Sequence, residues 1–199
     1  MAGSSGLVPT NLVMGPARIY LGTFDPTLAN EPALTALNTT PAASSWFDVG
    51  MTNGGTTVSV APTYSPFNGD QLVDDLGANL TGRKITVKVS MTEMTLTSLQ
   101  NAWNTSAPTT GAGYAYLEPA YQQSASQPAY AALLIDGIAP RTAVGATQRR
   151  RVILRKVLPT GNTDLTWDKT NQQVLAVEYQ AFFVSETVAP FRVIDPAVS

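Results

Sequence analysis

Residues 83–103 carry two hydrophobic periods, one directly after the other. In the first half every second residue is apolar, namely Ile85, Val87, Val89 and Met91. In the second half apolar residues recur at steps of three and four, namely Leu96, Leu99 and Trp103. A period of two is typical of a half-buried strand, and steps of three and four are typical of one face of a helix. The stretch therefore predicts a strand that passes directly into a short amphipathic helix.

The rest of the chain is dominated by short apolar segments separated by turn residues. The segments predicted as strands are 17–22, 46–50, 56–61, 114–117, 130–135, 148–158, 174–185 and 191–194. Asn53-Gly54-Gly55 predicts a tight turn that joins 46–50 to 56–61, because these residues supply the positive φ that hairpins need. We therefore expect a mainly β fold: an antiparallel β-sandwich or barrel with one flanking α-helix at about residues 95–104 and long loops or arms.

The pattern suggests one domain with two less regular parts. Residues 1–16 contain Gly, Ser and Pro and little periodicity, so we expect an N-terminal arm. Residues 17–199 are then a single β-sandwich domain. Residues 62–82 form a long connection between two predicted strands, and we expect them to be the tip of a projecting hairpin.

Composition favours a protein that associates with itself. Hydrophobic residues make up 44% of the chain and charged residues only 13%, against a usual charged share of about a quarter. A surface poor in charge has little protection against association. With a net charge of −2, double-stranded nucleic acid is not an obvious tight partner, because phosphate binding depends on clustered cations.

Composition also limits the possible chemistry. The chain has no His and no Cys, which excludes a Ser-His-Asp triad, a Cys-His dyad and an ordinary zinc site. We therefore expect no enzymatic activity, no metal and no cofactor. No apolar run approaches the ~18 residues of a membrane span, and the N-terminus lacks the pattern of a signal peptide. We expect synthesis and retention in the cytoplasm.

Two charged clusters are candidates for contacts. Asp70, Asp74 and Asp75 do not match a calcium loop; they are solvated loop acids, an inter-subunit contact, or a metal or catalytic group. Arg149, Arg151 and Arg155 share one face of a predicted strand. Three interpretations are open for this face. It is an exposed sheet face or edge strand whose charges prevent association, a surface that pairs with an acidic patch on a neighbouring subunit, or a nucleic-acid site. The larger aromatic residues are expected in the core, namely Trp46, Trp103, Trp167, Tyr179, Phe182 and Phe183.

The order of these features resembles the major tail tube proteins of long-tailed bacteriophages, a family that also looks related to type VI secretion tube proteins. The matching pieces are GPARIYLG at 15–22, WFDVG at 46–50, NGG at 53–55, DQ at 70–71, the strand at 84–91, TLTSL at 95–99 and the strand at 174–183 with a short strand after it. These pieces span most of the chain, and residues 105–147 match least.

The resemblance implies a β-sandwich with one helix, six of which close a ring. Stacked rings form a tube that carries DNA from head to host without specific binding. The implied partners are further copies of the chain and the tape measure, tail terminator and baseplate proteins, with no membrane. The implied location is the virion tail, assembled in the host bacterial cytoplasm. In that family the long hairpin and terminal arms contact the next ring.

Placed on this sequence, the resemblance suggests two sets of residues. Candidates for inter-ring or inter-subunit contact are Phe67, Asp70, Gln71, Asp74, Asp75, Arg149, Arg151 and Arg155. Candidates for the tube lumen are Lys88, Ser90 and Thr92, on the polar face of the alternating strand. Two other functions stay open: another virion part on a similar fold, such as a tail terminator, baseplate ring or capsid decoration protein, and an enzyme or carbohydrate-binding sandwich.

Overall fold

A computed structural model describes residues 15–68, 73–119, 127–139 and 149–196. Their elements are β1 (Arg18–Thr23), β2 (Trp46–Asp48), β3 (Thr52–Phe67), β4 (Gly77–Met91), α1 (Leu96–Trp103), β5 (Thr109–Gly111), β6 (Tyr114–Tyr116), β7 (Ala131–Ile138), β8 (Arg149–Pro159), β9 (Leu175–Ala181) and β10 (Phe191–Ile194). The N-terminal arm expected at 1–16 lies almost entirely outside the described residues.

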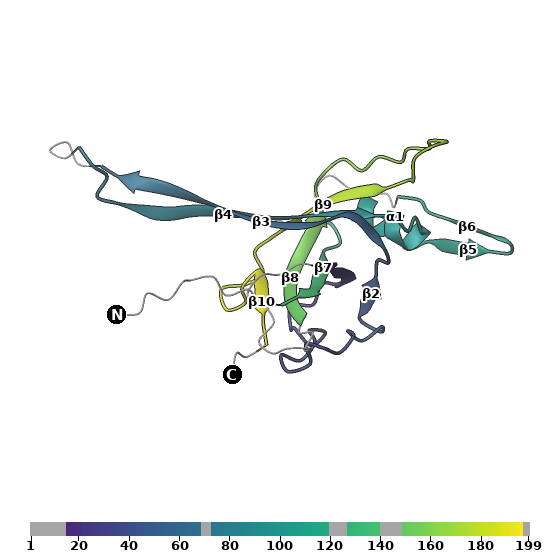
Figure 1. The fold of residues 1–199 in the computed structure, drawn as a ribbon, viewed down its shortest axis with the longest axis horizontal. Coiled ribbons are helices and arrows are strands. Elements are labelled where there is room, and N and C mark those ends of the chain that lie inside the picture. Colours follow the sequence, from purple (N-terminus) through teal and green to yellow (C-terminus); the bar gives the residue numbers. More distant parts are fainter. Residues whose placement is uncertain (1–14, 69–72, 120–126, 140–148, 197–199) are drawn as a thin grey trace, which may run out of the picture.

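The described strands form an eight-stranded antiparallel sheet and a separate two-stranded hairpin. The order in the large sheet is β2-β1-β7-β8-β9-β4-β3, with β10 also paired to β8. The sheet folds over at β8, because β8 pairs with β10 along residues 151–154 and with β9 along 157–159. Two layers result, and they cross steeply (Figure 1). The mainly β prediction is confirmed. The sheet is open, since β2 and β3 at its two ends are not paired with each other within the described residues.

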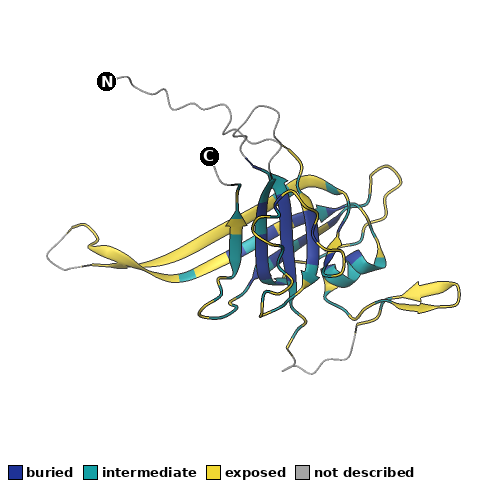
Figure 2. Ribbon diagram, turned by 90° about the horizontal axis from the view of Figure 1, so that it is seen from below, coloured by how far each residue is buried: buried dark blue, intermediate teal, exposed yellow. Residues whose placement is uncertain are grey.

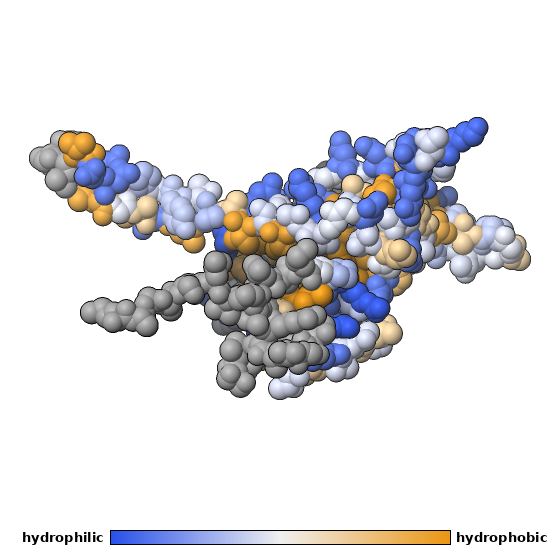
Figure 3. Space-filling view, in the orientation of Figure 1, coloured by the Kyte–Doolittle hydropathy of each residue, from blue (hydrophilic) through white to orange (hydrophobic). Residues whose placement is uncertain are grey.

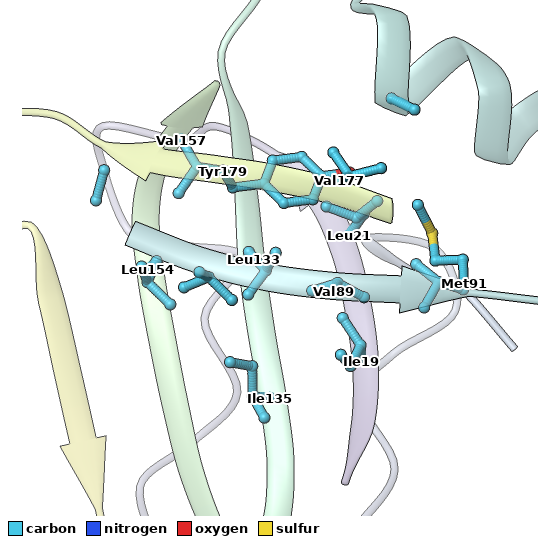
Figure 4. Close-up of a cluster of buried hydrophobic side chains, with 14 of the residues drawn as sticks. Ile19, Leu21, Val89, Met91, Leu133, Ile135, Leu154, Val157, Val177 and Tyr179 are labelled. Atoms are coloured by element: carbon cyan, nitrogen blue, oxygen red, sulfur yellow. The ribbon is translucent and has the colours of Figure 1, made fainter. Parts of the chain in front are cut away.

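The main core lies between the two layers. One layer contributes residues such as Ile19, Leu133 and Leu154, and the other contributes alternate residues of β4 and β9 (Figure 4). The alternation predicted for residues 85–91 is confirmed, because all four apolar side chains of this stretch are at most 2% exposed. Alternate residues of β9 are also buried, including Tyr179, which was expected in the core. The prediction that Phe183 lies in the core is wrong, because this residue lies beyond the strand and is 67% exposed.

The predicted helix is present, with a different buried face. Thr95 is the N-cap and its hydroxyl accepts a hydrogen bond from the Ser98 amide at 3.1 Å, which satisfies one of the amides left unpaired at a helix start. Ser98 and Ala102 are buried, while Trp103 is 42% exposed. The prediction that Trp103 faces the core is wrong, because Ala102, one residue earlier, takes the position against the sheet.

The predicted tight turn at residues 53–55 is also wrong. Strand β2 pairs with β1 and not with β3. Gly54 and Gly55 do have positive φ, at 83° and 81°, but they lie within β3. The pairing passes there from Thr52↔Met91 to Thr56↔Val89, so extra residues bulge from β3. The glycines serve a β-bulge, which needs the same left-handed backbone as a tight turn.

Candidate assembly surfaces

The long hairpin formed by β3 and β4 is largely exposed outside the part of β4 that lies on the core. The two strands stay paired from Thr52↔Met91 to Phe67↔Gly77. The distal half stands clear of both layers and is exposed on both sides (Figures 1 and 2). The connection expected at 62–82 is therefore mostly paired strand, with a short tip. Because an isolated two-stranded hairpin is at best marginally stable in water, this element is suited to packing against a partner.

The two sides of the hairpin differ in chemistry. One side, the apolar ribbon face, consists of Val58, Val60, Pro62, Tyr64 and Pro66 from β3 with Ala78 and Leu80 from β4, and it also carries Arg83, opposite Pro62. The other side, the polar ribbon face, includes Ser59, Ala61, Thr63, Ser65, Asn79 and Lys84. The assignment follows from alternation along β3 and from the cross-strand pairs. A bulge at Thr81, whose hydroxyl donates to the Thr63 carbonyl at 3.1 Å, keeps Tyr64 and Leu80 opposite each other.

The apolar ribbon face continues the core side of the sheet, and no described residues form a layer over it. Val58 and Val60 pair with Val87 and Ile85, which are 0% and 2% exposed, yet Val58 and Val60 themselves are 39% and 43% exposed. Further out, Tyr64 and Leu80 are 59% and 56% exposed. Covering a side chain of this size stabilises a complex by roughly 1.5–3 kcal/mol, so the face is a strong candidate for a contact.

The tip of the hairpin adds further exposed apolar side chains. Phe67 and Leu76 are joined by a hydrogen bond from the Leu76 amide to the Phe67 carbonyl at 2.8 Å. Both side chains are exposed, as is Val73, and hydrophobic residues are visible at the tip and where the hairpin leaves the body (Figure 3). Asp74 and Asp75 are exposed beside them. Asp70 and Gln71 lie outside the described residues.

The candidate lumen residues lie on the side of β4 away from the core. Lys88 is exposed and its Nζ atom lies 3.4 Å from a carboxylate oxygen of Glu178 on β9. Ser90 is half-buried on the same side. Thr92 follows the strand, and both its amide and its hydroxyl donate to the Met51 carbonyl at 2.9 Å. Lys88 is therefore the most accessible of the three.

The structure corrects the assignment of two of the three candidate arginines. Strand β8 is central and not an edge strand, and the face that carries Arg151 and Arg155 is covered by the connection 24–45. Arg151 is 0% and Arg155 is 4% exposed. Their guanidinium groups are occupied within the chain, so the prediction that they contact a neighbouring subunit is wrong. Arg149 is partly exposed, 3.6 Å from the Asp136 carboxylate.

These buried arginines hold the long connection onto the sheet. Arg151 donates to the carbonyls of Ala36, Leu37 and Thr39 at 3.4, 3.3 and 2.9 Å. Arg155 forms an ion pair with Glu31 and donates to the Ala189 carbonyl at 2.6 Å. The connection also covers a second apolar cluster that includes Tyr20, Trp46 and Leu134. Sequence reasoning missed this role because the partners lie more than 100 residues away.

The connection between β8 and β9 presents a different surface. Trp167 is 80% exposed, which contradicts its expected place in the core. The adjacent Asp168 accepts hydrogen bonds from the Thr170 amide and the Asn171 side chain at 2.9 and 2.6 Å. These hydrogen bonds lower the pKa of Asp168 to about 2. The bond from the Thr170 amide contributes most, followed by the bond from the Asn171 side chain.

Within the described ranges, no group of three or more acidic residues is placed to hold a metal ion. No described helix is long and apolar enough to cross a membrane.

The other aromatic residues that were expected in the core differ in burial. Trp46 and Tyr179 are 5% and 1% exposed, and Phe182 is half-buried.

Comparisons with known proteins give little more. No family model matches the chain, and no curated protein matches its sequence. One similar solved structure is described as the cryo-EM structure of the anti-feeding prophage (AFP) baseplate, 6-fold symmetrised. It superposes with a TM-score of 0.42 and 12% identity, over 92% of this chain and 95% of that chain. A match at this level assigns neither a family nor a function.

Proposed function

We propose that this chain is a structural virion protein: a tail tube subunit that self-assembles into stacked rings, six subunits to a ring, and forms a conduit for DNA ejection. The observation that carries the proposal is the apolar ribbon face, an extension of the core side of the sheet that the described part of the chain leaves uncovered. The low charge of the chain and the order of sequence features that resembles tail tube proteins support it.

The long hairpin supplies the contact between rings in this proposal. Its apolar ribbon face and its tip, with Phe67, Asp74 and Asp75, pack against the next ring, together with Asp70 and Gln71 of the tip sequence. Arg149 remains a candidate for an inter-subunit ion pair. Lys88, Ser90 and Thr92 face the lumen. The partners are other copies and the tape measure, terminator and baseplate proteins; DNA passes without specific binding, and the role is structural and not enzymatic.

Electron microscopy of the purified protein tests the proposal. Negative staining is expected to show rings or tubes over a range of protein concentrations, alone or with other tail components. A species that stays monomeric under all of these conditions would overturn it. Counting copies per particle separates the tube from other virion roles, because a tube subunit is present in very many copies and a terminator forms a single ring.

A matched pair of variants tests the role of the ribbon. Tyr64→Glu with Leu80→Glu places two charges on the apolar ribbon face and is expected to leave single subunits with an unchanged unfolding transition. Ser65→Glu with Asn79→Glu changes the adjacent cross-strand pair on the polar ribbon face and is expected to keep assembly. If both double variants assemble equally well, the apolar ribbon face is not the contact.

A further inference from the structure

A second exposed hairpin carries a pair of aromatic side chains. Strands β5 and β6 form this aromatic hairpin, in which Tyr116 pairs with Thr109 and Tyr114 with Gly111. The two tyrosines are two residues apart and share one side. Their rings are stacked, with centroids 6.2 Å apart and planes at 23°, and the side chains are 65% and 42% exposed.

Glycines leave room for the rings on this side. The ring of Tyr114 lies over Gly111, where a Cβ atom would come within 2.5 Å of its Cζ atom. Gly113 has φ of 86° and supplies the left-handed residue of the connecting turn. The two rings together present one exposed aromatic surface.

The aromatic hairpin carries no charge, and the long hairpin has long uncharged stretches. Residues 104–117 contain no charged residue, and neither do 53–67 or 76–82; the charges of the long hairpin are at its tip and from Arg83 onward on β4. Exposed hairpins are usually protected from association by charge, and three-residue strands are too short to be stable alone. Tyr is also enriched among the residues that dominate binding energy at interfaces. Both hairpins therefore have the chemistry of contact surfaces.

The positions of the two hairpins rule out a contact within one chain. They project from opposite ends of the long axis of the molecule (Figure 1). Copies arranged head to tail bring the aromatic hairpin of one copy to the long hairpin of the next. Such a contact joins two different surfaces, so it propagates through further copies instead of ending at a dimer.

We propose that Tyr114 and Tyr116 dock on the apolar ribbon face of the next copy of this chain. The aromatic pair covers Tyr64, Leu80 and the adjacent prolines. Arg83, opposite Pro62, is the charged side chain on this face, and a guanidinium group can pack on an aromatic ring without losing its charge. The proposal rests on self-assembly as proposed above, and it names the surface that occupies the ribbon. It gives a role to residues 105–117, a region outside the matched pieces of the sequence.

Disulfide trapping between two single-cysteine variants tests the contact directly, because the chain has no cysteine of its own. Thr109→Cys lies opposite Tyr116 on the aromatic side, and Ala78→Cys lies opposite Pro66 on the apolar ribbon face. Both leave the tyrosines, Tyr64 and Leu80 intact. Mixed under assembly conditions and oxidised, the two variants are expected to give a covalent dimer with one copy of each. Val60→Cys, with Thr109→Cys, samples a second position on the same face.

Controls use the adjacent positions on the opposite sides. Thr110→Cys with Asn79→Cys is expected to lose the cross-link, because disulfides form only when the two Cβ atoms come close. Tubes or rings without a cross-link to either ribbon position overturn this proposal and leave the proposed function standing. A cross-link of Thr109→Cys to itself, or to another tail protein, also overturns it. Absence of any assembly overturns the proposed function and this contact together.

Discussion

Asp136 and Arg151 face each other across the β7–β8 ladder and form a bidentate ion pair closed to solvent. The Nε and Nη2 atoms of Arg151 donate to the two carboxylate oxygens at 2.7 and 2.8 Å. The same guanidinium group donates to three carbonyls of the connection 24–45. One buried pair therefore fixes both a strand register and a long irregular segment.

Asp136→Asn is expected to lower the free energy of unfolding by about 3–5 kcal/mol, because it leaves the Arg151 charge buried without its counter-ion. Chemical unfolding followed by circular dichroism measures this. Asp195→Asn is the matched control, since it breaks the Arg150–Asp195 pair at 2.6 Å in which both side chains are about 40% exposed. It should cost less than about 1 kcal/mol. Equal losses from the two variants would contradict the importance of burial.

Thr95→Ala is expected to destabilise the chain by about 0.5–2 kcal/mol, because the Ser98 amide loses its acceptor at the start of α1. Thermal unfolding gives the value. Thr95→Ser keeps the hydroxyl and should stay close to the native stability. A serine variant as unstable as the alanine variant would show that the methyl group matters, and not the cap.

Asp168 is expected to titrate near 2, below its ordinary value of 3.8, because the Thr170 amide and the Asn171 side chain hold its charged form. The folded-state pKa lies below the unfolded-state value, so these hydrogen bonds favour the folded loop above pH about 4. The contribution is lost as the pH falls through 2. Asn171→Ala should raise the pKa, and Gln172→Ala should not. The carboxyl chemical shift followed by NMR reports both.

Lys88 is expected to be sheltered in assembled tubes, because the proposal places it in the lumen. A small acetylating ester should modify Lys88 in free subunits and in tubes. The same ester attached to a large polymer should modify it only in free subunits. Mass spectrometry locates the modified residue. Modification of Lys88 in intact tubes by the polymer reagent would place this side chain outside the lumen.

Local patterns in the sequence predicted the elements whose cause is local. The alternation at 85–91 predicted β4, because every second side chain of this strand packs against the opposite layer. Residue 95 was predicted as the start of a helix, and Thr95 is the N-cap of α1. Long-range packing decided the rest. The sequence pattern placed Arg151 and Arg155 on an exposed face, because no neighbouring residue in the sequence indicates that residues 31–39 pack over them.

The same limit applies to the glycines and the aromatics. Positive φ at Gly54 and Gly55 fits a turn or a bulge equally well, and only the pairing of β2 with β1 distinguishes the two. Trp167 is large and apolar, but its place in a connection between strands leaves it exposed. For the candidate contacts, the sequence located the long hairpin, while the division into two faces needed the cross-strand register.

Strand β8 pairs with both β9 and β10, and this arrangement has a consequence for the timing of folding. One edge of β8 is shared by β9 and by β10, and β10 is the last described strand to leave the ribosome. Until residues 191–194 are synthesised, the backbone of β8 at 151–154 has an open edge, and open edges invite pairing with other chains. A nascent subunit is therefore prone to misassociation between the synthesis of β8 and that of β10, when this edge is unpaired.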